Sequence, residues 1–245
     1  MGECCLKGFR WDAQPKGYEA KLGNNNCYVT GSNSNVAIMI IHDLYGWKFP
    51  NIRILADHYG EEVNAVVYVP DFFAGEELPL DILQDQSQWH KLDLPAFIGR
   101  HSRTSREPEI VDCAKALRCQ YHRIGAVGFC YGGWGVFRLG AKGNDLVDCI
   151  STAHPSFLEK TDINHIGVPV QIMAPEIDPM FTPELKAHSN QIIPTLGVAY
   201  DYQYFPGLEH AFAVRGDPKK EGERKGMERA KSAAVSWLKL WLNDI

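Results

Sequence analysis

Short, predominantly apolar runs recur along the chain from Val36 onward, and longer amphipathic stretches separate them. The runs occupy residues 36–41, 65–70, 123–128, 146–152, 169–174 and 199–205. Apolar residues at helical spacing follow in segments 52–63, 107–119, 134–139, 183–193 and 225–243. Strands that are apolar throughout are typical of a parallel sheet covered by helices on both faces. The pattern therefore predicts an α/β protein with a mostly parallel central sheet.

The length of 245 residues fits one domain, which we expect to span residues 1–245. No internal repeat, low-complexity tract or Pro/Ser-rich linker divides the chain. The segment before residue 35, with its NNN and GSNSN turns, is expected to form an edge hairpin. The connection 71–105 carries no clear periodicity, and its length is typical of a lid or binding loop.

Composition excludes several classes of function. A net charge of −5 without a long run of one sign argues against binding to nucleic acid or to an anionic membrane. No apolar window reaches the length of a membrane span, and the first residues lack the pattern of a secretory signal, so we expect a cytoplasmic protein. We expect it to be a monomer or a weak homodimer.

The seven cysteines form an odd set without C-x-x-C pairs or histidines at zinc-finger spacing. They are Cys4, Cys5, Cys27, Cys113, Cys119, Cys130 and Cys149. This pattern argues against a disulfide framework and against a structural zinc site, so we expect reduced thiols, no metal and no cofactor. Most of these thiols are expected to be packing residues.

One cysteine stands in a more specific setting. Residues 128–133 read GFCYGG between an apolar strand and a predicted helix, the G-x-nucleophile-x-G pattern of the α/β-hydrolase fold. There a strained turn projects the nucleophile above the sheet, and flanking glycines let the backbone pass closely. A thiol is easier to ionise than a hydroxyl and its thiolate is a better nucleophile. The alternative is a buried packing cysteine in a glycine-rich turn.

Two later residues favour the catalytic interpretation. An α/β-hydrolase places an acid after a later strand and a histidine after the last one. Asp178 follows the run 169–174, and His210 follows the run 199–205. Both fall at carboxyl ends of predicted strands, where open α/β sheets bind ligands. Glu176 is the rival acid, with a solvated loop carboxylate as its alternative role.

The roles of these residues follow from their chemistry. His210 would take the proton of Cys130 and return it to the leaving group, while Asp178 would orient the imidazole and stabilise its charged form. Backbone N–H groups of Tyr131, after the nucleophile, and of Leu44, after the first apolar run, are the expected oxyanion donors. Each such donor typically contributes about 3 kcal/mol of transition-state stabilisation.

The chain resembles the dienelactone hydrolase (carboxymethylenebutenolidase) family. The similarity is specific at HDLYGW, PDFFAGE, GFCYGG and the pair DPMFTP and EHAF, and extends from about residue 25. Members hydrolyse enol-lactone esters with a Cys-His-Asp triad, so the resemblance implies these roles for Cys130, His210 and Asp178.

The resemblance also shows departures from the bacterial members. In those proteins a glutamate in the loop matching HDLYGW draws the proton off the thiol once substrate is bound; this chain has Asp43, which alternatively caps the loop. Two bacterial arginines hold the substrate carboxylate. Here Gly75 stands where the first would fall, and Arg215 lies one residue beyond the expected place of the second. The chain is more similar to the eukaryotic, especially fungal, branch.

Several further residues are candidates for substrate binding because they lie in or beside loops at the carboxyl edge of the predicted sheet. They are Tyr45, Trp47, Phe72, Phe73, Trp89, Trp134 and His154. The aromatic residues could equally be core residues, and His154 could cap a helix or turn.

The leading functional hypothesis is a cysteine-dependent hydrolase of small lactones or esters that works through a thioester acyl-enzyme. The alternative is a small-molecule binding or receptor protein on a hydrolase scaffold with marginal turnover. Redox chemistry at Cys130 needs a resolving thiol, and none is near it in the sequence. A metal-dependent hydrolase is disfavoured because the chain has no H-x-x-x-H motif or carboxylate cluster.

Overall fold

The computed structural model describes residues 3–33 and 35–243. The two ends of the predicted domain, residues 1–2 and 244–245, and position 34 of the predicted N-terminal turn lie outside the described residues. Within the described part, an eight-stranded sheet has the order β1-β2-β4-β3-β5-β6-β7-β8. The strands are β1 Tyr18–Leu22, β2 Asn25–Thr30, β3 Val36–Ile41, β4 Val66–Pro70, β5 Arg123–Phe129, β6 Cys149–Ala153, β7 Val170–Ile177 and β8 Tyr200–Glu209.

The strand directions confirm the predicted sheet. From β4 through β3 to β8 every neighbouring pair is parallel, whereas β1 and β2 form the predicted antiparallel hairpin at the edge. Gly23, at φ 58°, lies in the hairpin turn, a conformation that glycine adopts without a Cβ clash. All six residues of β3 are buried, as its unbroken apolar run predicts.

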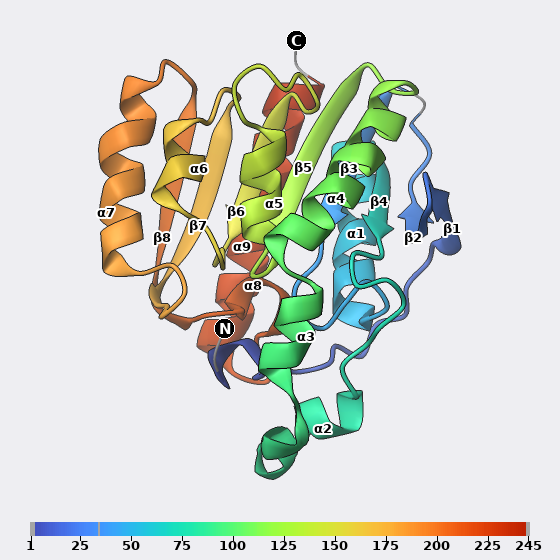
Figure 1. Cartoon of the computed structure of the whole chain (residues 1–245), viewed down its shortest axis with the longest axis vertical. Helices are drawn as coiled ribbons and strands as arrows, with labels where there is room; N and C mark the ends of the chain where they lie inside the picture. The colour runs from blue at the N-terminus through green and yellow to red at the C-terminus, as the bar shows by residue number, and fades with distance from the viewer. Residues whose placement is uncertain (1–2, 34, 244–245) are drawn as a thin grey trace.

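Helices cover both faces of this sheet, as predicted (Figure 1). One layer contains α4, α5, α6 and α7, which contact one another in succession, and the other contains α1, α8 and α9. The bounds are α1 Pro50–Val63, α4 Arg103–Arg118, α5 Gly132–Leu139, α6 Lys160–Asn164, α7 Pro183–Ile192, α8 Phe212–Arg215 and α9 Glu221–Leu242. Each described helix is too short or too polar to cross a lipid bilayer.

The helix predicted at 107–119 begins earlier than expected. Ser102 accepts a hydrogen bond from the N–H of Ser105 and thereby caps the helix N-terminus, so α4 starts at Arg103. Pro108 consequently lies inside the helix instead of near its start. It removes one backbone hydrogen bond there.

The long connection 71–105 contains short helices. They are α2 Leu80–Gln84, the 3₁₀-helix η2 Gln86–Lys91 and α3 Leu94–Arg100, and α2 projects beyond the carboxyl end of the sheet in Figure 1. Its base is anchored, because Glu76 pairs with Arg100 and His101 and the ring of Phe73 packs against that of Phe97.

The N-terminal segment lies at the same end of the sheet. It begins with the 3₁₀-helix η1 Glu3–Cys5, which Figure 1 shows close to α8. The third 3₁₀-helix, η3 Ile193–Thr195, follows α7. The chain start is therefore placed beside the loops that leave the carboxyl ends of the parallel strands.

Candidate active site

Cys130 lies in the turn between β5 and α5, as the GFCYGG pattern predicts. Its φ is 48°, an uncommon value for a residue with a Cβ. The glycines on either side of Cys130 are required because neighbouring backbone leaves no room for a Cβ atom. A Cβ on Gly132 would lie 2.0 Å from the carbonyl oxygen of Ile41, and a Cβ on Gly128 would lie 2.4 Å from that of Gly132. The turn is therefore held tightly between β3 and the start of α5.

Asp178 and His210 meet beside this turn. His210 Nδ1 donates to Asp178 Oδ1 at 2.9 Å, and both side chains are fully buried. The same oxygen accepts the N–H groups of Met180 and Phe181, which fixes the carboxylate. The exposed carboxylate of Glu176 instead accepts the N–H of Gly207. The acid in contact with the histidine is thus Asp178.

The pKa values of His210 and Cys130 are both raised, with opposite consequences for their charge. Burial opposes the charged form of His210, but the hydrogen bonds to Asp178 and Cys5 outweigh it and raise the histidine pKa to about 9. Burial raises the pKa of the Cys130 thiol well above its ordinary value. Cys130 Sγ lies 3.4 Å from Ser156 Oγ. The histidine therefore favours its charged form, whereas Cys130 favours the neutral thiol.

Cys5 is a site residue that the sequence reasoning missed. Its Sγ lies 3.6 Å from Nε2 of His210, the residue that was expected to take the proton of Cys130. The ligand atoms of Cys5, Cys130 and His210 all lie within 4.8 Å of one another. Six of the seven cysteines were left without an individual role, and the tandem pair Cys4 and Cys5 near the chain start was the available signal.

Arg215 and Asp43 form a buried ion pair. Arg215 Nε lies 2.6 Å from Asp43 Oδ2, and neither side chain is exposed. Asp43 Oδ1 also accepts the N–H of Tyr45 at 3.0 Å, so the carboxylate caps its loop as well as pairing. The guanidinium lies over the Tyr45 ring, 4.3 Å from its centroid.

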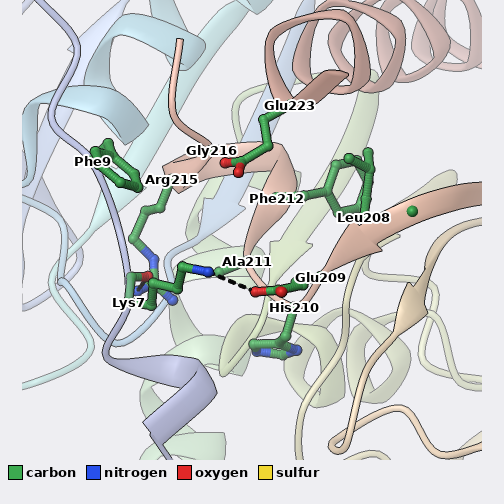
Figure 2. A pocket seen from close by; sticks show the side chains of 11 residues that line it. Lys7, Phe9, Leu208, Glu209, His210, Ala211, Phe212, Arg215, Gly216 and Glu223 are labelled. Carbon is green, nitrogen blue, oxygen red and sulfur yellow. Dashed lines mark hydrogen bonds and ion pairs between the residues drawn. The ribbon is translucent and has the colours of Figure 1, made fainter. Parts of the chain in front are cut away.

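Arg215 also holds the N-terminal segment. Its Nη1 donates to the carbonyls of Cys5 and Lys7, at 2.9 and 2.6 Å. Figure 2 shows the side chain running from α8 toward this segment, and the ion pair between Lys7 and Glu209 close to His210. The guanidinium is thus engaged by protein groups. A cavity of about 70 Å³ lies beside Lys7, His210 and Arg215.

The two expected oxyanion donors are buried near the turn. Leu44 follows Asp43 in the loop after β3, and Tyr131 follows Cys130 directly. Among the described residues, neither backbone N–H donates to a protein acceptor. Both are therefore free to donate to another group.

His154 packs directly on the catalytic histidine candidate. It follows β6, its ring centroid lies 5.1 Å from that of His210, and its φ is 41°. Neither ring nitrogen has a hydrogen-bond partner among the described residues. Burial and the neighbouring charges of His210 and Arg215 lower the His154 pKa well below its ordinary value. It is a neutral ring beside the site.

The aromatic candidates fall into two groups. Phe72 and Phe73 follow β4 and pack against His42, and Phe73 also contacts the Tyr131 ring. Trp134 likewise packs edge-on against the Tyr131 ring and also contacts Arg103. Trp47 instead contacts Arg53, and Trp89 Nε1 donates to the Leu83 carbonyl in the α2–η2 segment.

Comparison with known proteins decides the family. The sequence model of the dienelactone hydrolase family matches residues 26–242. The chain belongs to this family. Two fungal relatives support this assignment to the family. Hydrolase tropI of Talaromyces stipitatus is 29% identical to this chain, and hydrolase pyvD of Aspergillus violaceofuscus is 30% identical. Each alignment covers 98% of this chain and 96% of the relative.

A solved structure supports the fold of this dienelactone hydrolase family member. The dienelactone hydrolase from Anabaena variabilis superposes with a TM-score of 0.65 at 13% identity, covering 94% of this chain and 100% of that one. The predicted α/β-hydrolase fold is thereby confirmed.

Proposed function

We propose that this member of the dienelactone hydrolase family hydrolyses small carboxylic esters or lactones through a thioester on Cys130. The observation that carries the proposal is the buried Asp178–His210 hydrogen bond beside a cysteine in a strained strand-to-helix turn. A histidine oriented by a carboxylate next to a nucleophile is the arrangement that acyl transfer requires. Residues 1–245 are taken to act as one domain in the cytoplasm, where the seven free thiols would stay reduced.

The reaction divides into acylation and deacylation. The Cys130 thiolate attacks the ester carbonyl carbon, and the departing alkoxide takes a proton from His210. A water molecule then attacks the thioester while His210 accepts its proton, which releases the acid and restores the thiol. The N–H groups of Leu44 and Tyr131 stabilise the oxyanion in both steps.

The resting thiol has to be activated. Because burial raises the pKa of Cys130, the neutral thiol dominates until a base takes its proton. Asp43 is the candidate base, and in the resting structure it is engaged by Arg215. An anionic or strongly polarised substrate group that competes for Arg215 would release the Asp43 carboxylate.

Substrate access requires a change at the N-terminal segment. Cys130 is fully buried, and the cavity beside His210 holds about 70 Å³, whereas ligand pockets are typically about 300–1,000 Å³. Displacement of η1, which carries Cys5, would enlarge this space. The substrate is thus proposed to enter where the N-terminal segment now lies.

The test is a panel of small lactones and activated esters assayed with wild type and variants. Cys130→Ala is expected to lower kcat/KM by on the order of a thousandfold or more, because the nucleophile is lost. Cys149→Ala is the matched control, since Cys149 is an equally buried thiol in β6. Asp43→Ala is expected to lower kcat. Full activity of Cys130→Ala on every substrate would refute the proposal.

A further inference from the structure

The two sulfurs in the site are far apart in the sequence but neighbours in the fold. Cys5 Sγ, Cys130 Sγ and one ring nitrogen of His210 lie within 4.8 Å of one another, and both cysteines are fully buried. A disulfide has an S–S length of about 2 Å, so a shift of about 3 Å or less brings the sulfurs to bonding distance. The second thiol that a disulfide requires, and that the sequence did not reveal, is therefore present at Cys5.

Cys5 is held at this place by the backbone on either side of it. Arg215 Nη1 donates to the carbonyls of Cys5 and Lys7, and Tyr45 Oη donates to the carbonyl of Leu6 at 2.7 Å. The N–H of Phe9 donates to the Arg215 carbonyl. These contacts, of which those to Cys5 and Leu6 are buried, fix the main chain, so the approach of Cys5 to Cys130 is a built feature of the fold.

The surroundings supply what thiol oxidation needs. Hydrogen bonds from the Cys130 thiol and from Cys4 and His210 lower the pKa of Cys5, whereas burial raises the pKa of Cys130. Hydrogen bonding therefore favours ionisation at Cys5 over Cys130, so Cys5 is the sulfur of the pair that reacts first. A cavity of about 70 Å³ that is lined by His210 admits a small molecule with the volume of a few waters. Hydrogen peroxide meets this limit, and bulky hydroperoxides do not.

We propose that hydrogen peroxide oxidises Cys5 and Cys130 to a reversible disulfide that switches the hydrolase off. The switching rests on the proposed role of Cys130 as the nucleophile; the bond itself depends only on the geometry of the two sulfurs.

The chemistry balances in two steps. The Cys5 thiolate attacks one peroxide oxygen, the O–O bond breaks, and the departing hydroxide takes a proton from His210 and leaves as water. The Cys130 thiol then attacks the sulfenic sulfur, the S–O bond breaks, and a second water leaves. Two thiols are oxidised by two electrons in total and one peroxide is reduced. A small dithiol reverses the bond by exchange.

The test treats the full chain with hydrogen peroxide, blocks remaining thiols in acid and digests without reduction. Wild type is expected to lose two hydrogens and to yield tryptic peptide 124–138 joined to peptide 1–7. Ester hydrolysis, normalised to the untreated sample, is expected to fall in proportion to the cross-linked fraction and to return with dithiothreitol. A bulky hydroperoxide at the same concentration is expected to act much more slowly.

Cysteine variants show which sulfur of the N-terminal peptide bonds to Cys130. Cys4→Ser is the matched control and should retain the cross-link. Cys5→Ser should lose it and should resist the peroxide, because the sulfur that reacts first is gone; in Cys130→Ser, Cys5 should instead oxidise to a sulfinic acid that dithiothreitol does not reduce. Absence of the joined peptides in oxidised wild type overturns the proposal even if Cys5→Ser does not fold.

Two other outcomes separate the claims. A cross-link that leaves hydrolysis unchanged supports the pairing and overturns Cys130 as the nucleophile. Inactivation without a cross-link, with a sulfinic acid on Cys5 or Cys130 of wild type, would overturn the disulfide.

Discussion

Replacement of Arg215 by methionine probes the charge pair on which the site is built. The guanidinium and the Asp43 carboxylate are both fully buried at 2.6 Å, so removing the cation leaves an uncompensated buried anion. Such a change typically costs about 3–5 kcal/mol. The carbonyls of Cys5 and Lys7 lose their donor in the same step. We expect the free energy of unfolding to fall by about 4 kcal/mol, out of the roughly 5–15 kcal/mol typical of a domain.

A double-mutant cycle separates this charge effect from lost packing. Asp43→Asn in the Arg215→Met background removes the stranded anion, so the pair of substitutions should cost at least about 2 kcal/mol less than the sum of the single ones. Arg229→Met is the matched control. This exposed arginine also donates to a carbonyl, that of Tyr204, and lies over an aromatic ring, and its loss should cost less than about 1 kcal/mol.

The assay is urea unfolding followed by tryptophan fluorescence, with the slope m checked for constancy. Additive effects of the two substitutions, or a cost of Arg215→Met no larger than that of Arg229→Met, would show that the buried pair does not hold the site together.

Two further predictions follow from the turn and from the histidine. Gly132→Ala should lower the free energy of unfolding in urea by about 1–3 kcal/mol, because its Cβ would lie 2.0 Å from the Ile41 carbonyl oxygen. Gly99→Ala, on open helix surface, is the control and should change the free energy of unfolding by less than about 1 kcal/mol. Equal effects of the two substitutions would contradict the packing argument. The hydrogen bonds to Asp178 and Cys5 outweigh burial and raise the His210 pKa from 6.5 to about 9. The stabilisation by the charged histidine should therefore be complete below pH 6.5 and should disappear as the pH rises to about 9, a loss of about 3 kcal/mol relative to His210→Gln. Parallel pH dependence of unfolding in wild type and that variant would exclude this.

The parts that follow local pattern could be predicted from the sequence. A parallel strand that is buried on both faces is apolar at nearly every position, so a run such as 36–41 can be recognised as a strand from its own residues alone. The order of Cys130, Asp178 and His210 is readable for a similar reason: the chain leaves each parallel strand at the same edge of the sheet.

The parts that depend on distant segments could not be predicted. Cys5 reaches His210 because Arg215 and Tyr45 bind the main chain around it, and no periodicity encodes a contact between the two ends of a chain. Arg215 was assigned to a substrate carboxylate from its place after His210, yet in the structure the carboxylate beside it belongs to Asp43. In the segment 71–105 the helices are too short to show a period.

The central claim is that Cys130 carries the acyl group during ester hydrolysis. The most direct measurement is single-turnover mass spectrometry with p-nitrophenyl acetate, quenched in acid and mapped by peptide. We predict that peptide 124–138 gains one acetyl group in wild type, that the adduct clears before the next turnover, and that it is absent from Cys130→Ala. Hydrolysis without an adduct on this peptide, or an adduct that forms and never clears, would contradict the account.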